Sequence, residues 1–281
     1  MPTALITGAS SGLGYEFAKI HAAKGGDLVL VARNIQQLNK LKDSIQASNN
    51  VRVHIIEKDL SRPSAAYEIL DYTQMHQLQI DILINNAGFG YMDDFLDAPL
   101  QKDEDMIRLN MLALTQLTKL FAPQMVQLGK GHIMNVASTA AFQPGPTMAV
   151  YCATKAYVLH FSEAIASELD GTGVTVTAFC PGATATAFMS VAEMEDSALV
   201  KGRKLPSAEE VARYGYTAMM GGKRVVIHGV KNSLMVLGIR FTPRNLVTKV
   251  ARMVVKKKEV CRTGRKIFRP YIPVEKDFSG R

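Results

Sequence analysis

Cysteine, tryptophan and long apolar runs are scarce in this sequence. It has no tryptophan and three cysteines, Cys152, Cys180 and Cys261, an odd number without the spacing of a zinc site, so we expect reduced thiols rather than a disulfide framework. No apolar run approaches the roughly 18 residues that a membrane-spanning helix needs. No leader precedes the strand-like residues that begin at Thr3, which predicts the absence of a signal peptide. The six histidines are scattered and predict no metal site. Together these features favour a cytoplasmic protein.

The charge is unevenly distributed along the chain. The 281 residues include 47% apolar and 21% charged residues, an ordinary globular composition, and the net charge is +8. Residues 1–220 carry a net charge of −5, whereas residues 221–281 carry +13. The positive charge therefore belongs to the C-terminal segment and not to the body of the protein.

Short apolar runs alternate with amphipathic stretches over most of the chain. This alternation predicts βαβ units in a doubly wound parallel sheet of the Rossmann type, a three-layer α/β/α architecture formed as one domain by residues 1–230. Expected strands cover residues 4–7, 28–32, 51–56, 80–84, 133–136, 174–179 and 225–227. Expected helices follow the first glycine-rich turn and cover residues 35–47, 64–76, 102–128 and 151–170, and another begins at residue 206.

A glycine-rich segment separates the first strand from the first helix. Small residues there let the backbone approach a pyrophosphate, and the N-terminus of the helix offers free N–H groups to its charge. A plain tight turn is the alternative, since the spacing is G-x-x-x-G-x-G rather than G-x-G-x-x-G. The candidate cofactor-binding residues in this turn are Gly8, Ser10, Ser11, Gly12, Leu13 and Gly14.

Arg33 follows the second strand, where dinucleotide sites that prefer NAD place a carboxylate against the ribose 2′-hydroxyl. A guanidinium can instead pair with the 2′-phosphate of NADP(H). We therefore predict NADP(H) as the cofactor. The alternative is that Arg33 is a solvated charge at the end of a strand.

Tyr151 and Lys155 are four residues apart in an expected helix and therefore share one face. A nearby ammonium favours the phenolate, so we expect Lys155 to lower the pKa of Tyr151 and make it a usable general acid and base. Without partners, an exposed surface pair would be the better interpretation. The partners are further residues at strand ends, which meet at one edge of a parallel sheet: Asp59, Asn86, Ala87, Gly88, Ser138, Pro181 and Gly182.

These motifs, in this order and close to these spacings, resemble those of the short-chain dehydrogenase/reductase family over roughly residues 3–230. The resemblance implies a catalytic set of Asn110, Ser138, Tyr151 and Lys155. Tyr151 would exchange a proton with the substrate oxygen, Ser138 would donate a hydrogen bond to the same oxygen, and Lys155 would also bind the nicotinamide ribose. Asn110 would position a water for proton relay.

The resemblance also implies cofactor contacts and an oligomer. Asp59 would accept from the adenine amino group, and Asn86, Ala87 and Gly88 would pack along the adenine ribose. Thr186 would lie beside the carboxamide, with Thr184 a weaker candidate. Members of the family are commonly homodimers or tetramers.

Two segments after the sixth strand lack a clear place in the sheet. Residues 183–205 lack a clear period but include Phe188, Met189, Met194 and Leu199, which predicts a substrate lid over a hydrophobic pocket. Residues 231–260 are expected to form a basic amphipathic extension, with Thr242 and Pro243 beginning a helix, and 261–281 a mobile tail. Residues 242–258 could contact an anionic membrane surface peripherally, or dock on the domain or on a second subunit. Nucleic-acid binding is not expected.

The pattern thus favours an NADP(H)-dependent carbonyl reductase or alcohol dehydrogenase that acts on a fairly apolar small molecule. A 3-oxoacyl thioester, a steroid-like ketone and a hydrophobic aldehyde all fit. Two other interpretations are a non-catalytic NADP(H)-sensing protein and a membrane-associated scaffold that uses the basic C-terminus.

Overall fold

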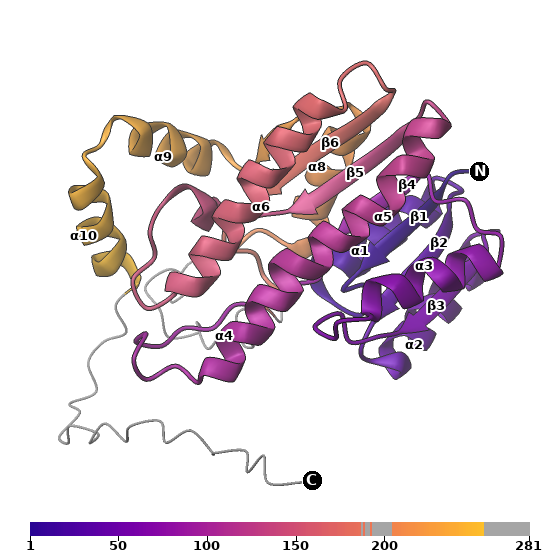
Figure 1. Ribbon diagram of the computed structural model, residues 1–281, viewed down its shortest axis with the longest axis horizontal. Coiled ribbons are helices and arrows are strands. Elements are labelled where there is room, and N and C mark those ends of the chain that lie inside the picture. The colour runs from indigo at the N-terminus through magenta and orange to yellow at the C-terminus, as the bar shows by residue number, and fades with distance from the viewer. Residues whose placement is uncertain (187, 189–191, 193–203, 256–281) are drawn as a thin grey trace, which may run out of the picture.

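The computed structural model describes residues 1–186, 188, 192 and 204–255. Seven parallel strands form one sheet in the order β3-β2-β1-β4-β5-β6-β7 (Figure 1). The strands are β1 (Thr3–Thr7), β2 (Asp27–Ala32), β3 (Val53–Glu57), β4 (Ile82–Asn85), β5 (Gly131–Val136), β6 (Val174–Cys180) and β7 (Val225–Ile227). The predicted Rossmann-type α/β fold is confirmed.

Helices cover both faces of the sheet, which is why its central strands are buried along their whole length and mostly apolar. Alternate residues of β1 enter two separate cores, with Ile6 in one and Leu5 in the other. The first core includes α1 (Gly12–Ala23), α2 (Ile35–Ser48) and α8 (Ala208–Met220). The second includes α3 (Ala65–Met75), α5 (Leu114–Gln127) and α6 (Ala149–Glu168).

The helix predicted over residues 102–128 is in fact three consecutive pieces. It consists of α4 (Leu100–Ile107), the π-helical turn η1 (Arg108–Ala113) and α5. A π turn adds a residue to the helical repeat and occurs frequently at functional sites. Because the apolar spacing of the sequence continues across it, the sequence predicted one uninterrupted helix. The turn carries Asn110.

The carboxyl ends of all strands lie at one edge of the sheet. From β1 the chain winds outward through β2 and β3, and then returns to place β4 on the other side of β1. The strand order therefore reverses between β1 and β4, which is where ligands bind in sheets of this kind. In Figure 1 this edge faces the side of the molecule that carries α4 and α9.

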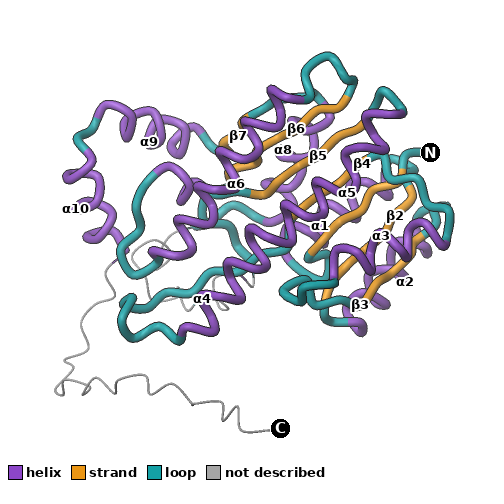
Figure 2. The backbone as a smooth tube through the Cα atoms, in the orientation of Figure 1, coloured by secondary structure: helices purple, strands orange, loops and turns teal. Residues whose placement is uncertain are grey.

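Two helices follow the last strand, α9 (Val230–Phe241) and α10 (Arg244–Val255). Both lie beyond the carboxyl edge of the sheet (Figures 1 and 2). The sequence did not predict α9. Thr242 was expected to cap the start of α10, but its hydroxyl donates to the carbonyl of Gly238 at 2.8 Å and so closes α9 instead.

Several predicted segments fall outside the described residues. They are most of the lid (187, 189–191 and 193–203), the lysines at 256–258 and the tail at 261–281. Within the described part of the chain, no helix is long and apolar enough to cross a bilayer.

Candidate active site

Tyr151 and Lys155 lie on the inner side of α6, at the carboxyl edge of the sheet. Both side chains are buried, with 7% and 5% of their surface exposed. The Lys155 ammonium lies 5.9 Å from the centroid of the Tyr151 ring and donates to the carbonyl of Val136, the last residue of β5, at 2.7 Å. The interpretation of the two residues as an exposed surface pair is therefore wrong.

The expected effect of Lys155 on Tyr151 is wrong for this structure. Burial raises the pKa of the Tyr151 hydroxyl well above its usual value of 10.0. Burial also lowers the pKa of Lys155 from 10.5 to about 8. The reason is that both groups are removed from water, so that each favours its neutral form. The influence that lowers the pKa of Tyr151 comes from a hydrogen bond of the Ser138 side chain.

Ser138 follows β5 and begins the 3₁₀ turn η2 (Thr139–Phe142). Its oxygen accepts from the N–H of Ala140 at 3.1 Å, which orients the side chain. The hydroxyl proton is thereby available to Tyr151. The structure thus brings together the two hydroxyls that the sequence predicted to face one substrate oxygen.

Asn110 is buried behind Lys155 and holds the loop after β4. Its Nδ2 donates to the carbonyl of Phe89 at 3.0 Å, and its Oδ1 accepts from the N–H of the same residue at 3.2 Å. A Cβ placed on Gly88 would lie 2.9 Å from Oδ1 of Asn110 and 3.5 Å from Nζ of Lys155. The structure therefore brings Gly88, Asn110 and Lys155 together.

Thr154 is a site residue that the sequence analysis missed. Its Oγ1 accepts from Nδ2 of Asn110 at 3.1 Å and donates to the carbonyl of Tyr151 at 2.8 Å. Thr154 is 1% exposed and thus links two predicted catalytic residues from inside the protein. Its position directly before Lys155, on the same buried side of the helix, was the only signal of this role in the sequence.

Apolar side chains also pack around the Tyr151 ring. The rings of Tyr151 and Phe188 are 5.6 Å apart, and a Cβ on Gly90 would lie 3.1 Å from the Tyr151 ring. The apolar cluster around Tyr151 contains Phe89, Tyr91, Met92, Met106, Met148, Cys152, Phe188 and Ala192. Phe142 packs in a separate cluster with Val158 and Leu159.

The first turn of α1 is tied to the loop after β4. The Oγ1 of Thr7 accepts from the N–H groups of Asn86 and Ala87, each at 3.0 Å, and Nδ2 of Asn86 donates to the carbonyl of Thr7 at 2.9 Å. A Cβ on Gly14 would lie 2.4 Å from the carbonyl oxygen of Gly8. Only glycine allows this close approach.

The start of α1 provides free backbone donors. Ser11 has an extended backbone, and among the described residues its side chain accepts no hydrogen bond from the helix. Ser10 and Leu13 flank this position in the turn and the first helical residues. Gly12 has φ +57°, and a Cβ there would lie 3.4 Å from the side chain of Thr186. The α1 turn and the segment after β6 therefore face each other.

The predicted residues after β6 occupy different environments. Pro181 and Thr184 are buried, and the Thr184 hydroxyl donates to the carbonyl of Gly182 at 3.0 Å. Thr186 is half-buried, and its Oγ1 accepts from the N–H of Phe188 at 3.3 Å. Thr186 thus lies closer to the helix start than the better-buried Thr184.

Arg33 and Asp59 lie near each other, beyond the ends of β2 and β3. Burial alone would raise the pKa of Asp59, but two hydrogen bonds from Ser61 and the charges of Arg33 and Arg62 outweigh it and lower that pKa. Arg33 is exposed, and within the described part of the chain it makes no ion pair. Its guanidinium is therefore available to an anionic ligand.

These donors fit a nicotinamide dinucleotide. The uncapped helix N-terminus suits a pyrophosphate, the glycines allow its close approach, and Arg33 suits a phosphate on the adenine ribose. Among the described residues, no group of three or more His, Cys, Asp or Glu side chains could hold a metal ion.

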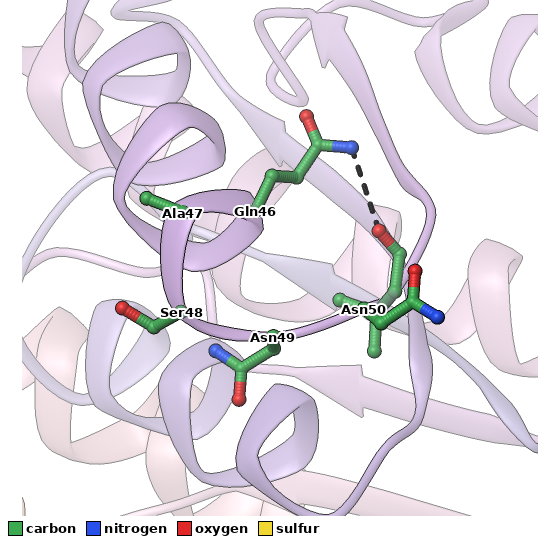
Figure 3. A pocket seen from close by; sticks show the side chains of 6 residues that line it. Gln46, Ala47, Ser48, Asn49 and Asn50 are labelled. Atoms are coloured by element: carbon green, nitrogen blue, oxygen red, sulfur yellow. Dashed lines mark hydrogen bonds between the residues drawn. The ribbon is translucent and has the colours of Figure 1, made fainter.

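Two hollows lie at the opposite edge of the sheet, away from these residues. Gln46 to Val51 line one of them after the end of α2, where Nε2 of Gln46 donates to the carbonyl of Val51 at 3.4 Å (Figure 3). The other lies at the amino ends of β1 and β3, between Pro2, Arg52 and Asp81. Neither contains the convergent buried groups found around Tyr151.

Residues 2–196 match the short chain dehydrogenase family. The chain belongs to this family. Its members are oxidoreductases that use a nicotinamide cofactor and act on small molecules. The predicted family is thereby confirmed, while the role of each site residue stays a prediction.

One similar family member is a very-long-chain 3-oxoacyl-CoA reductase from Pyrenophora tritici-repentis, 37% identical over 179 residues. The match covers 62% of this chain and 52% of that protein, so the chain spans about half the length of this relative. A short-chain dehydrogenase from Sphingobium yanoikuyae, solved in complex with NADPH, superimposes with a TM-score of 0.77 at 31% identity, covering 93% of this chain and 99% of that one.

A third similar protein is the bulky-bulky ketone specific alcohol dehydrogenase from Comamonas testosteroni. It superimposes with a TM-score of 0.73 at 30% identity, covering 86% of this chain and 92% of that one. Both solved structures thus share nearly the whole fold with this member of the family.

Proposed function

We propose that this protein is an NADP(H)-dependent carbonyl reductase or alcohol dehydrogenase for a fairly apolar substrate. The observation that carries the proposal is the buried Tyr151: the Ser138 side chain lowers the pKa of its hydroxyl, its ring packs in an apolar cluster, and the Lys155 ammonium lies 5.9 Å from the ring centroid. When bound, the nicotinamide supplies or accepts the hydride.

Tyr151 moves the proton in this proposal. During reduction its hydroxyl protonates the substrate oxygen, and during oxidation it takes the proton from the alcohol. Because burial favours the neutral phenol, Tyr151 is held ready as an acid. Ser138 donates a second hydrogen bond to the same oxygen and stabilises the negative charge that develops on it.

Lys155 and Asn110 position the other reactants. Lys155 is fixed by the carbonyl of Val136 and offers its remaining N–H groups to ribose hydroxyls. Burial lowers its pKa to about 8, so that most of Lys155 still carries its charge at neutral pH. Asn110 holds the loop after β4 in place through its two hydrogen bonds to the backbone of Phe89.

Two features support the finer assignments of cofactor and substrate. Arg33 is an exposed cation just beyond the end of β2, which suits a 2′-phosphate, and the similar Sphingobium yanoikuyae protein was solved with NADPH. The aromatic and methionine side chains around Tyr151 favour a hydrophobic group next to the carbonyl. The reductase and ketone dehydrogenase among the similar proteins act on substrates with such groups, a 3-oxoacyl-CoA and bulky ketones. A cytoplasmic homodimer or homotetramer remains our prediction.

NADPH oxidation by the purified full chain, measured over a panel of ketones, aldehydes and 3-oxoacyl thioesters, tests the proposal. We expect turnover of apolar members and a loss of kcat of about 100-fold or more in Tyr151→Phe, since that variant lacks the transferred proton. Tyr157→Phe is the matched control, because it removes a hydroxyl from the same helix whose hydrogen-bond partner, within the described part of the chain, is Thr115. Absence of turnover across the panel, or full turnover in Tyr151→Phe, would contradict the proposal.

A further inference from the structure

Helix α9 turns an apolar stripe outward. Val230, Leu234, Leu237 and Phe241 recur at intervals of four, three and four residues, which places them on one face of the helix. These four side chains are between 52% and 82% exposed, whereas Val236 on the other side of the helix is buried. Surface helices normally turn such a stripe toward the core, so an outward stripe indicates an interaction surface.

Helix α10 repeats the pattern with a second outward stripe. Leu246, Val250 and Met253 are between 44% and 66% exposed and lie at intervals of four and three residues. Val247 and Ala251, on the adjacent side of the helix, are buried. The stripe on α10 is therefore additional to the contacts that hold this helix in place.

The charges around both stripes have one sign. Residues 221–255 contain seven Lys or Arg residues and no Asp or Glu. On α9, Lys231 and Arg240 flank the stripe on opposite sides; on α10, Lys249 and Arg252 follow one edge of it. Within the described part of the chain, none of these four side chains makes an ion pair. The body of the protein, residues 1–220, carries the opposite net charge.

We propose that α9 and α10 dock on the surface of a lipid bilayer that contains anionic headgroups. An apolar stripe with cationic flanks matches such a surface, because the stripe can enter the acyl boundary while the cations remain among the phosphates. A second copy of the chain fits less well, since a two-fold contact between the stripes would bring the flanking cations of one subunit against those of the other. The sequence pointed only to residues 242–258, whereas α9 supplies the longer stripe.

The docking surface adjoins the candidate active site. A Cβ on Gly182 would lie 2.5 Å from the side-chain amide of Asn232 in the first turn of α9, and α9 packs against η2, which begins beside Ser138. A bilayer under α9 would therefore lie close to the substrate side of Tyr151. An apolar substrate could then enter from the bilayer; this entry route depends on the proposed function, but the docking itself does not.

Co-sedimentation of the full chain with vesicles tests the proposal. The vesicles are pure phosphatidylcholine or phosphatidylcholine with phosphatidylglycerol. We expect binding to the anionic vesicles, weak binding to the neutral ones, and a decrease in 0.5 M salt. A triple variant should bind the anionic vesicles at least about tenfold more weakly than the wild type, because the inserted apolar area is lost. Its substitutions are Leu234→Gln, Leu237→Gln and Phe241→Gln. Lys231→Gln with Arg240→Gln should weaken binding to the anionic vesicles alone.

Phe95→Gln with Leu96→Gln is the matched control, because both residues are highly exposed and apolar but lie outside α9 and α10. It should bind like the wild type. Failure of the wild type to co-sediment with anionic vesicles would overturn the proposal, as would equal binding by the triple variant. A change of oligomeric state in the triple variant, measured by light scattering, without a change in vesicle binding would identify the stripe as a subunit contact and also overturn it. NADPH oxidation with a water-soluble ketone tests the catalytic proposal separately.

Discussion

The Thr154 hydroxyl lies between two residues of the proposed catalytic set. It accepts from Asn110 and donates to the backbone of Tyr151, in a buried position where unpaired polar groups are costly. Thr154 cannot contact the reacting atoms from there. Its effect on the reaction must therefore pass through Asn110 and through the start of α6.

Thr154→Val should lower kcat by about 3- to 10-fold, the value of one lost hydrogen bond, and leave the KM of the ketone nearly unchanged. The reason is that Asn110 would lose a partner that fixes its amide, while the apolar cluster stays intact. Steady-state kinetics with saturating NADPH measure this effect. Thr154→Ser keeps the hydroxyl and should restore kcat. A serine variant as slow as the valine variant would show that Thr154 acts only through packing.

Arg33 determines the choice of cofactor in our proposal. Arg33→Asp should weaken NADPH binding by about 10- to 100-fold, because a charge-assisted pair is replaced by repulsion, and should affect NADH binding much less. Fluorescence titration with each cofactor measures both affinities. Lys40→Gln, which removes an exposed charge from the surface of α2, is the control and should bind both like the wild type. If Arg33→Asp and the wild type prefer NADPH equally, the assignment of Arg33 is wrong.

Among the secondary-structure elements, those with an inward apolar face could be predicted and the others could not. The strands of the sheet are covered on both faces, so a continuous apolar run such as Leu28 to Ala32 predicts a buried strand. Helix α6 also follows the rule, since Val158 and Ala166 lie on its buried side. The site residues at strand ends could be predicted because they directly follow these apolar runs, and the carboxyl ends of parallel strands meet at one edge of the sheet.

The π turn η1 and helix α9 escaped prediction for opposite reasons. The π turn η1 inserts one residue into a helix whose apolar residues continue on either side, so the sequence carries little trace of it. Helix α9 turns its apolar stripe away from the core. A rule that expects apolar residues at helical spacing to face the core does not predict such a helix. Tertiary burial also reversed the expected pKa of Tyr151, which a helical spacing alone cannot show.

At the scale of the whole molecule, the buried His21 and the half-buried His132 join distant segments. The ring of His21 in α1 hydrogen-bonds with the hydroxyl of Tyr216 in α8 at 2.8 Å and with the carbonyl of Pro2 at 3.1 Å. His132 in β5 hydrogen-bonds with Thr175 in β6 at 2.8 Å. Such contacts break only when the sheet and its helices separate, so their protonation is linked to global unfolding.

Acidification should therefore destabilise the protein well before its carboxylates titrate. Burial lowers the pKa values of His21, His54 and His132 below 6.5, and for His21 it outweighs the opposing influence of Pro2, Asp27 and Asp81. Below about pH 6.5 the unfolded chain binds protons that the folded chain does not, so the free energy of unfolding falls as the pH falls.

Urea unfolding at pH 7.5, 6.5 and 5.5 measures this dependence, with His21 contributing at most about 1.4 kcal/mol per pH unit. His21→Gln should flatten the dependence between pH 6.5 and 5.5, because a neutral amide replaces the ring that resists protonation. It should also lower stability at pH 7.5, since the bond to Tyr216 is disturbed. His160→Gln changes an exposed ring and should leave the slope unaltered. If the free energy of unfolding depends on pH equally in His21→Gln and in the wild type, burial between α1 and α8 does not keep the His21 ring neutral in the folded protein.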